Sequence, residues 1–170
     1  MLTFLAADGA LFLIFFLAYL YLRWKTPAWA EALHFASAIM ATAMTLFALA
    51  GSFTMAAAAN AQSKNDNVLA ARLVAATVGL WVTFLICDAM EWGRLLFFEK
   101  PPLIFAQTFC LLTGYHALHL IAGLPYLVTV TVKTEKSDVG AAALLTHFTN
   151  LIWILIFVAF YMFGTDLQGL

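Results

Sequence analysis

Seven polar side chains of this sequence lie within long apolar runs, where groups that carry charge or need hydrogen bonds are unexpected. In a helix, residues three apart share a face, so Asp88 is paired with Glu91. The same spacing pairs His116 with His119. Paired carboxylates are suited to proton transfer, and paired imidazoles are suited to binding a metal or a haem iron. The whole set consists of Asp8, Asp88, Glu91, His116, His119, His147 and Asn150.

Three roles for these residues are compatible with the sequence. The first is a buried polar network that fixes the register of packed helices, and the second is a proton-handling or regulatory role. The third is a metal or haem site, but bis-histidine haem ligation requires imidazoles on facing helices, whereas His116 and His119 leave the same one. A zinc or dinuclear site needs further ligands at the same depth, and His34 and His147 lie near helix ends. The polar network is favoured over the cofactor site.

The composition indicates that lipid surrounds these residues. Of the 170 residues, 65% are hydrophobic and 10% are charged, and the mean hydropathy is +0.96. A soluble domain is roughly 45–50% apolar and about 25% charged. In lipid the backbone must satisfy its own hydrogen bonds, which leaves helices or a closed barrel. The apolar runs are continuous rather than alternating, so helices are expected, and the net charge of −1 gives nucleic acid no basic surface to bind.

Five segments are long enough to cross a bilayer as helices, which takes about 20 residues. The connections between them are short, so sequential helices are expected to be antiparallel neighbours. The predicted fold is an all-α membrane protein, a five-helix transmembrane up-down bundle forming a single domain over residues 1–170. The expected spans are residues 3–22, 34–59, 69–98, 103–132 and 140–163.

The loops leave the orientation of the bundle undetermined. The eight Lys and Arg residues divide equally between the two sides, so the positive-inside rule favours neither. No basic region precedes the first apolar run, which is therefore expected to be a retained helix and not a cleaved signal. Cys87 and Cys110 fall inside apolar segments and are expected to pack as free thiols.

One stretch has a specific pattern beyond hydrophobicity. Residues 109–123 read FCLLTGYHALHLIAG, which resembles the histidine-bearing helix of haem-copper oxidase subunit III, where a TGxHGLHV-type run is followed by a glycine. Four other stretches are similar to motifs of that family in the same order. They are LAADGALF at 5–12, TLFALAGSFTM at 45–55, DAMEW at 88–92 and HFTNLIW at 147–153.

This resemblance implies a function that the residues alone do not give. Members of the family hold no haem or copper, pack against catalytic subunit I and other oxidase subunits, bind phospholipid, stabilise the active site and support proton uptake. The chain is thus expected to be an accessory subunit of a respiratory terminal oxidase that reduces oxygen and translocates protons. The expected location is the bacterial plasma (inner) membrane, which the chain crosses several times, with haem and copper in the partner subunit.

Two departures from the family pattern fall on the fifth segment. Thr146 stands where the family usually has tryptophan, and Asn150 stands where an aspartate is common. The sequence also resembles the shorter bacterial forms, which lack two helices that border a lipid cleft in the seven-helix forms. Whether a polar link at Asn150 and a lipid cleft are kept is therefore open.

Two alternative functions stay open at this point. One is an accessory subunit of a nitric oxide reductase, because relatives of the family serve such complexes. The other is an independent haem-binding membrane cytochrome, which would use the histidines as ligands.

Overall fold

The computed structural model describes residues 2–26 and 29–162, and these residues form helices and short turns with no strand among them. Within these two ranges, five helices are long and apolar enough to span a membrane, which confirms the predicted fold class. Two of them, α4 (Asn67–Gly93) and α6 (Val139–Phe157), continue into π-helical turns over Arg94–Glu99 and Val158–Met162. The five are α1 (Leu2–Lys25), α3 (Ala38–Ser63), α4 (Asn67–Gly93), α5 (Leu103–Val132) and α6 (Val139–Phe157).

The second spanning helix begins and ends four residues later than the expected range of 34–59. It begins at Ala38 because the Ser37 hydroxyl accepts a hydrogen bond from the Met40 backbone N–H at 3.3 Å, as a helix N-cap does. His34 lies before this cap, in a 3-10 turn over Leu33–Phe35, and is exposed. The polar residues after position 59 continue the helix to Ser63.

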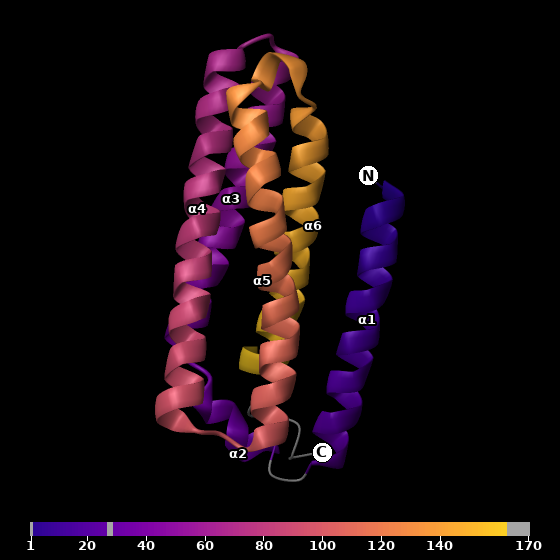
Figure 1. Ribbon diagram of the computed structural model, residues 1–170, viewed down its shortest axis with the longest axis vertical. Coiled ribbons are helices and arrows are strands. Elements are labelled where there is room, and N and C mark those ends of the chain that lie inside the picture. The colour runs from indigo at the N-terminus through magenta and orange to yellow at the C-terminus, as the bar shows by residue number, and fades with distance from the viewer. Residues whose placement is uncertain (1, 27–28, 163–170) are drawn as a thin grey trace.

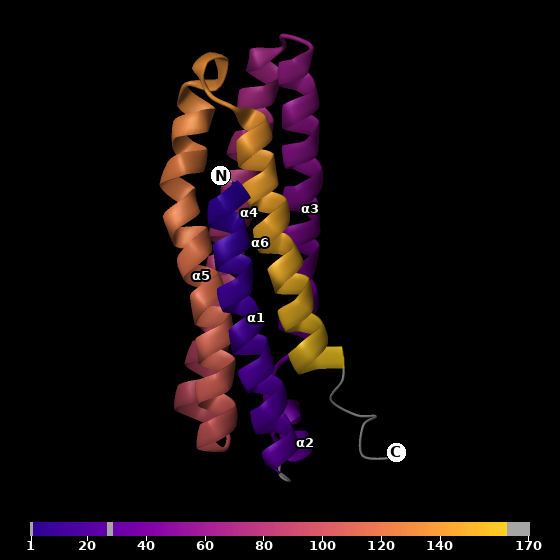
Figure 2. The same ribbon diagram turned by 90° about the vertical axis from the view of Figure 1, so that its right-hand side faces the viewer.

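Helices α3, α4, α5 and α6 pack into an antiparallel four-helix bundle, with α3 against both α4 and α6 (Figure 1). Helix α1 lies outside this bundle, beside α5 and α6 (Figure 2). The expectation that sequential helices are neighbours therefore fails for α1 and α3. The reason is the short helix α2 (Trp29–Ala32), which turns the chain at the base of the bundle before α3 begins.

Aromatic packing anchors α2 at this base. Trp29 is buried, and its ring lies 5.6 Å from that of Tyr19 on α1 and 5.5 Å from that of Phe105 on α5. These edge-to-face contacts fix α2 between α1 and the start of α5.

The outward faces of the helices are apolar, as expected for a protein in lipid. Large side chains are exposed along the bundle, including Ile39 at 86% and Phe53 at 74%. The polar side chains described below lie mainly inside, an inversion of the soluble pattern that fits a bilayer as solvent.

Helices α4 and α5 approach closely at one glycine. A Cβ atom on Gly123 would lie 2.7 Å from Cζ3 of Trp81, which is 1% exposed. The glycine thus allows the indole ring to pack directly on the α5 backbone, in the manner of small residues at membrane helix contacts.

Candidate functional site: the buried polar network

Asp8 joins α1 to α5 through two side chains. Its Oδ1 accepts a hydrogen bond from the Tyr115 hydroxyl at 2.9 Å and lies 2.8 Å from Nε2 of His119. The other ring nitrogen, Nδ1 of His119, lies 2.8 Å from the backbone carbonyl of Tyr115. Phe12 and Phe15 pack against the Tyr115 ring and surround the contact with apolar groups.

The tautomer of His119 follows from these contacts. A carbonyl oxygen only accepts, so Nδ1 of His119 must carry a proton. Nε2 lies at hydrogen-bond distance from the Asp8 carboxyl, and either partner can donate in that contact. With one proton between them the two groups are neutral as a pair, which lowers the cost of placing them in a membrane.

His116 contacts a different helix from its neighbour one turn away. Its Nε2 lies 3.1 Å from the Thr149 carbonyl on α6, so Nε2 carries the proton. Its Nδ1 is buried without a partner in residues 2–26 and 29–162, and the side chain is 1% exposed. The two imidazoles are therefore divided between α6 and α1, although their spacing predicts a shared face.

Glu91 is satisfied by Arg94 and by the start of α3. Its Oε1 lies 2.8 Å from Nη2 of Arg94 and accepts the Ser37 backbone N–H at 2.7 Å, while its Oε2 accepts Nε of Arg94 at 3.2 Å. Arg94 also donates to the Phe35 carbonyl and, at 3.1 Å, to Oε1 of Glu99. This cluster ties the end of α4 to the segment that precedes α3.

Among the described residues, Glu91 contacts neither Tyr115 nor His116 on α5. Arg94, in the π-helical turn after α4, and the Ser37 N–H hold the carboxylate toward the start of α3. Tyr115 donates to Asp8 instead.

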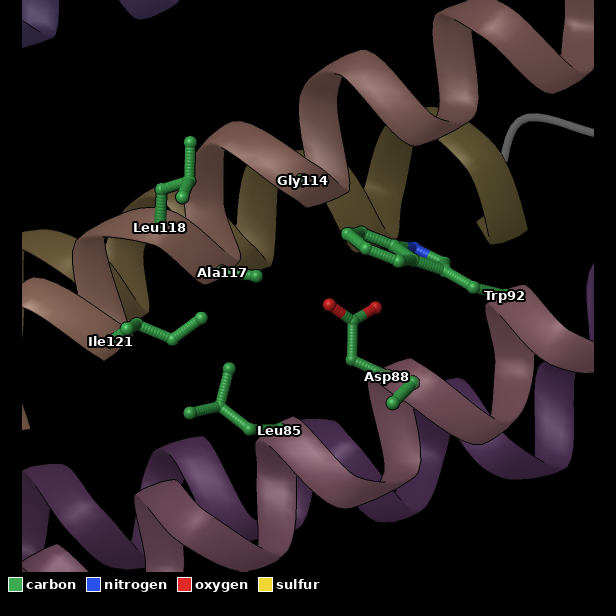
Figure 3. A pocket seen from close by; sticks show the side chains of 8 residues that line it. Leu85, Asp88, Trp92, Gly114, Ala117, Leu118 and Ile121 are labelled. Atoms are coloured by element: carbon green, nitrogen blue, oxygen red, sulfur yellow. The ribbon is translucent and has the colours of Figure 1, made fainter.

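Asp88 contacts neither the partners of Asp8 nor those of Glu91. It is 3% exposed, and among the residues that the structure describes it has no hydrogen bond or ion pair. Figure 3 shows its carboxylate in a hollow between α4 and α5, next to the indole of Trp92. That indole donates to the Thr113 hydroxyl at 2.9 Å, so its N–H is not free for Asp88.

Asn150 fastens α6 to α3. Its amide nitrogen donates to the Ala48 carbonyl at 2.6 Å and to the Ser52 hydroxyl at 2.7 Å. One turn on, the Trp153 indole donates to the Thr45 hydroxyl at 3.0 Å. The polar link on the fifth spanning helix is therefore kept with an amide, which donates where an aspartate only accepts.

His147 lies apart from the other predicted residues. Its side chain is exposed on α6, so the prediction that it belongs to a buried network is wrong. Its spacing from Asn150 places the two on neighbouring positions of the helix surface, but only Asn150 points to α3.

Two further residues connect helices and were not predicted from the sequence. Gln62 near the end of α3 donates to the Thr134 and Ser137 carbonyls at 2.8 and 2.9 Å and accepts from the Val139 N–H at 3.2 Å. Tyr19 on α1 donates to the Ala159 carbonyl, in the π-helical turn after α6. Gln62 falls in a polar stretch that reads as a loop, and Tyr19 is one of many aromatic residues, so neither gives a signal in the sequence.

A metal site is not formed by these side chains. No group of three or more His, Cys, Asp or Glu residues is placed to hold an ion within residues 2–26 and 29–162. Both ring nitrogens of His119 are already engaged, so ligation there would require breaking its contact with Asp8 or with the Tyr115 carbonyl. The arrangement binds helices to one another and, at Asp8 and His119, places a carboxyl group at hydrogen-bond distance from an imidazole nitrogen.

The comparison with protein families decides between the functions left open by the sequence. The family model described as cytochrome c oxidase subunit III matches residues 1–165. The chain belongs to the cytochrome c oxidase subunit III family. As a member, it is a non-catalytic subunit of an oxidoreductase complex and a multi-pass membrane protein.

Curated relatives carry the same name. Cytochrome c oxidase subunit 3 of Synechocystis sp. is 30% identical over 169 residues, which are 94% of this chain and 72% of the relative. The protein of that name from Alkalihalophilus pseudofirmus is 27% identical over 172 residues, 95% of this chain and 84% of the relative. The one from Mus musculus is 30% identical over 112 residues, 61% of this chain but 42% of the relative. These names support the oxidase function and neither the reductase nor the independent cytochrome.

Proposed function

We propose that this chain is a subunit III whose buried polar contacts hold five helices as a single domain against catalytic subunit I of a haem-copper oxidase. Haem and copper belong to that partner, phospholipid covers the remaining apolar surface, and the location is the bacterial plasma membrane. One observation carries the structural role: the polar contacts join different helices. Asp8 links α1 to α5, His116 links α5 to α6, Asn150 links α6 to α3, and Glu91 links α4 to the start of α3.

The shared proton of Asp8 and His119 supports a second part of the proposal, assistance to proton uptake. The pair has two arrangements of one proton, and Tyr115 donates to the carboxyl oxygen in both. Loss or gain of a proton here changes the charge at a helix contact, and a charge in lipid is costly enough to alter that contact. We propose that this pair couples the proton balance of the oxidase to the position of α1.

The test of the accessory role uses the whole oxidase complex, purified through a tag on this chain. A haem-bearing subunit is expected to co-purify with the wild-type chain. His119→Ala is expected to leave the haem absorbance per haem-bearing subunit unchanged and to lower the amount of that subunit that stays with the tagged chain in detergent. His147→Ala is the matched control, because that imidazole is exposed and outside the network. A haem band lost in His119→Ala, with the subunit ratio unchanged, would overturn the accessory role.

Asp8→Asn tests the proton proposal separately. The amide keeps an oxygen for the Tyr115 hydroxyl but cannot share a proton with His119. Complex assembly is expected to be retained while proton uptake by the reconstituted oxidase slows. Unchanged uptake in an assembled Asp8→Asn complex would show that the pair is structural only.

A further inference from the structure

The hollow around Asp88 lies on the face shared by α4 and α5, away from the network described above. It has a volume of about 210 Å³, and apart from the carboxylate its lining is almost wholly apolar. Figure 3 shows the carboxylate directed across the hollow toward α5, between Trp92 and Leu85. Gly114 and Ala117 form the α5 wall, and the rim is exposed at Leu118. The hollow is open to whatever surrounds the bundle.

The Asp88 carboxylate, unpaired within a membrane span, would be stabilised by a hydrogen-bond donor. Ionisable groups within membranes pair with one another or with polar groups, because an unpaired one is costly. The part of the chain that the structure describes supplies no donor to Asp88, since the nearby Trp92 indole is committed to Thr113. The donor must therefore come from outside residues 2–26 and 29–162.

Depth favours a helix over a lipid headgroup as the source of that donor. Asp88 is eleven residues before Glu99, the end of a 33-residue span, which is about 16 Å at 1.5 Å per residue. A span of this length is about 50 Å, so it extends about 10 Å beyond a 30 Å hydrocarbon core on each side when centred. Asp88 then lies about 6 Å inside the hydrocarbon, below the donors of phospholipid headgroups.

The size of the hollow fits one large side chain. Its volume is about 210 Å³. That is larger than a cavity of roughly 150 Å³, which accommodates benzene, and smaller than a pocket for a drug-sized ligand, which starts at about 300 Å³. The Trp92 ring packs on Gly114, and Ala117 is buried, so the small residues of the α5 wall leave room for an inserted side chain between α4 and α5.

We infer that the hollow is the docking site for a transmembrane helix of a partner oxidase subunit, which inserts one long hydrogen-bond-donating side chain onto Asp88. By charge complementarity this side chain is a lysine or arginine. The inference rests on the proposed function, because it requires an assembled complex. It assigns α4 and α5, at the level of Asp88 and Leu118, to a subunit interface.

Substitutions in the purified complex test the contact. Asp88→Leu removes the acceptor, and the affinity of the chain for the rest of the complex is expected to fall about three- to thirtyfold, the range for one interhelical hydrogen bond. Asp88→Asn keeps an acceptor oxygen and is expected to lose less. Ala89→Phe fills the hollow with Asp88 intact and is expected to act like Asp88→Leu, whereas Ala76→Phe, at an exposed α4 position outside the hollow, is the matched control.

Affinity is measured as the amount of haem that stays with this tagged chain after dilution in detergent. Retention of Asp88→Leu and Ala89→Phe at the wild-type level would overturn the docking site while leaving the proposed function intact. The proposed function fails separately, when the wild-type chain co-purifies with no haem-bearing subunit.

Photo-crosslinking identifies the occupant. With p-benzoylphenylalanine at Leu118 in the assembled complex, an adduct to a partner polypeptide is expected, and the same residue at Phe53 on α3 is the control. Adducts to lipid alone, an absence of adducts, or the same polypeptide adduct in equal yield from Phe53 would each overturn the inference.

Discussion

Gly123→Ala is the substitution whose effect follows most directly from the geometry. The added methyl would lie 2.7 Å from Cζ3 and 3.2 Å from Cη2 of Trp81, both far closer than van der Waals contact. The Trp81 ring is 1% exposed and packed in the core, so it cannot swing into free space. Overpacking of this kind costs about 1–3 kcal/mol, which corresponds to a roughly five- to 150-fold fall in the folding equilibrium constant.

The assay is reversible unfolding of the chain in bicelles with added denaturing detergent, followed by tryptophan fluorescence. Gly79→Ala is the control, because nothing lies within 4 Å of a Cβ at that position of α4. It is expected to be neutral or stabilising by up to about 1 kcal/mol, since alanine favours helix. Trp81→Phe in the Gly123→Ala background is expected to recover part of the loss, as a double-mutant cycle for two residues in contact. Gly123→Ala with wild-type stability would refute the close packing of α4 on α5.

Three further changes follow from single contacts of the network. Asn150→Asp places a carboxylate against the Ala48 carbonyl in place of a donor. The free energy of unfolding is therefore expected to fall by about 1–3 kcal/mol in the same assay. A more stable variant would contradict the assignment of Asn150 as a donor. His119→Ala removes a polar contact of α1. Amide hydrogen exchange in Leu2–Lys25 is therefore expected to rise about three- to thirtyfold, with exchange in α3 unchanged. An equal rise in both helices would argue against the position of α1 outside the four-helix bundle. Gln62→Ala releases the connection between α5 and α6, and limited proteolysis there is expected to accelerate, unlike in Ser63→Ala, whose hydroxyl contacts only its own helix.

The spanning helices could be predicted from the sequence because continuous apolar runs of this length have few other solutions in lipid. The burial of Asp8, Asp88, Glu91, His116 and Asn150 followed from the same reasoning, since each is flanked by apolar residues within such a run. Helix boundaries were harder where polar residues continue a helix, as they do at the end of α3.

The partners of these polar residues could not be predicted. Periodicity gives the face on which a residue lies but not the helix that covers that face. The placement of α1 beside α5 and α6 depends on the turn made by α2, and only this placement brings Asp8 to Tyr115 and His119. His147 was misassigned for the same reason, because nothing in its neighbourhood along the chain shows that its side of α6 is uncovered.

The central claim is that this chain supports an oxidase without holding its redox centres. The most direct measurement strips the chain from the tagged, purified complex with detergent and records haem absorbance and copper content in both fractions. All of the haem and copper are expected to stay with the remaining subunits, and the chain is expected to show only protein absorbance. Haem or copper that leaves with the isolated chain in stoichiometric amount would contradict the claim.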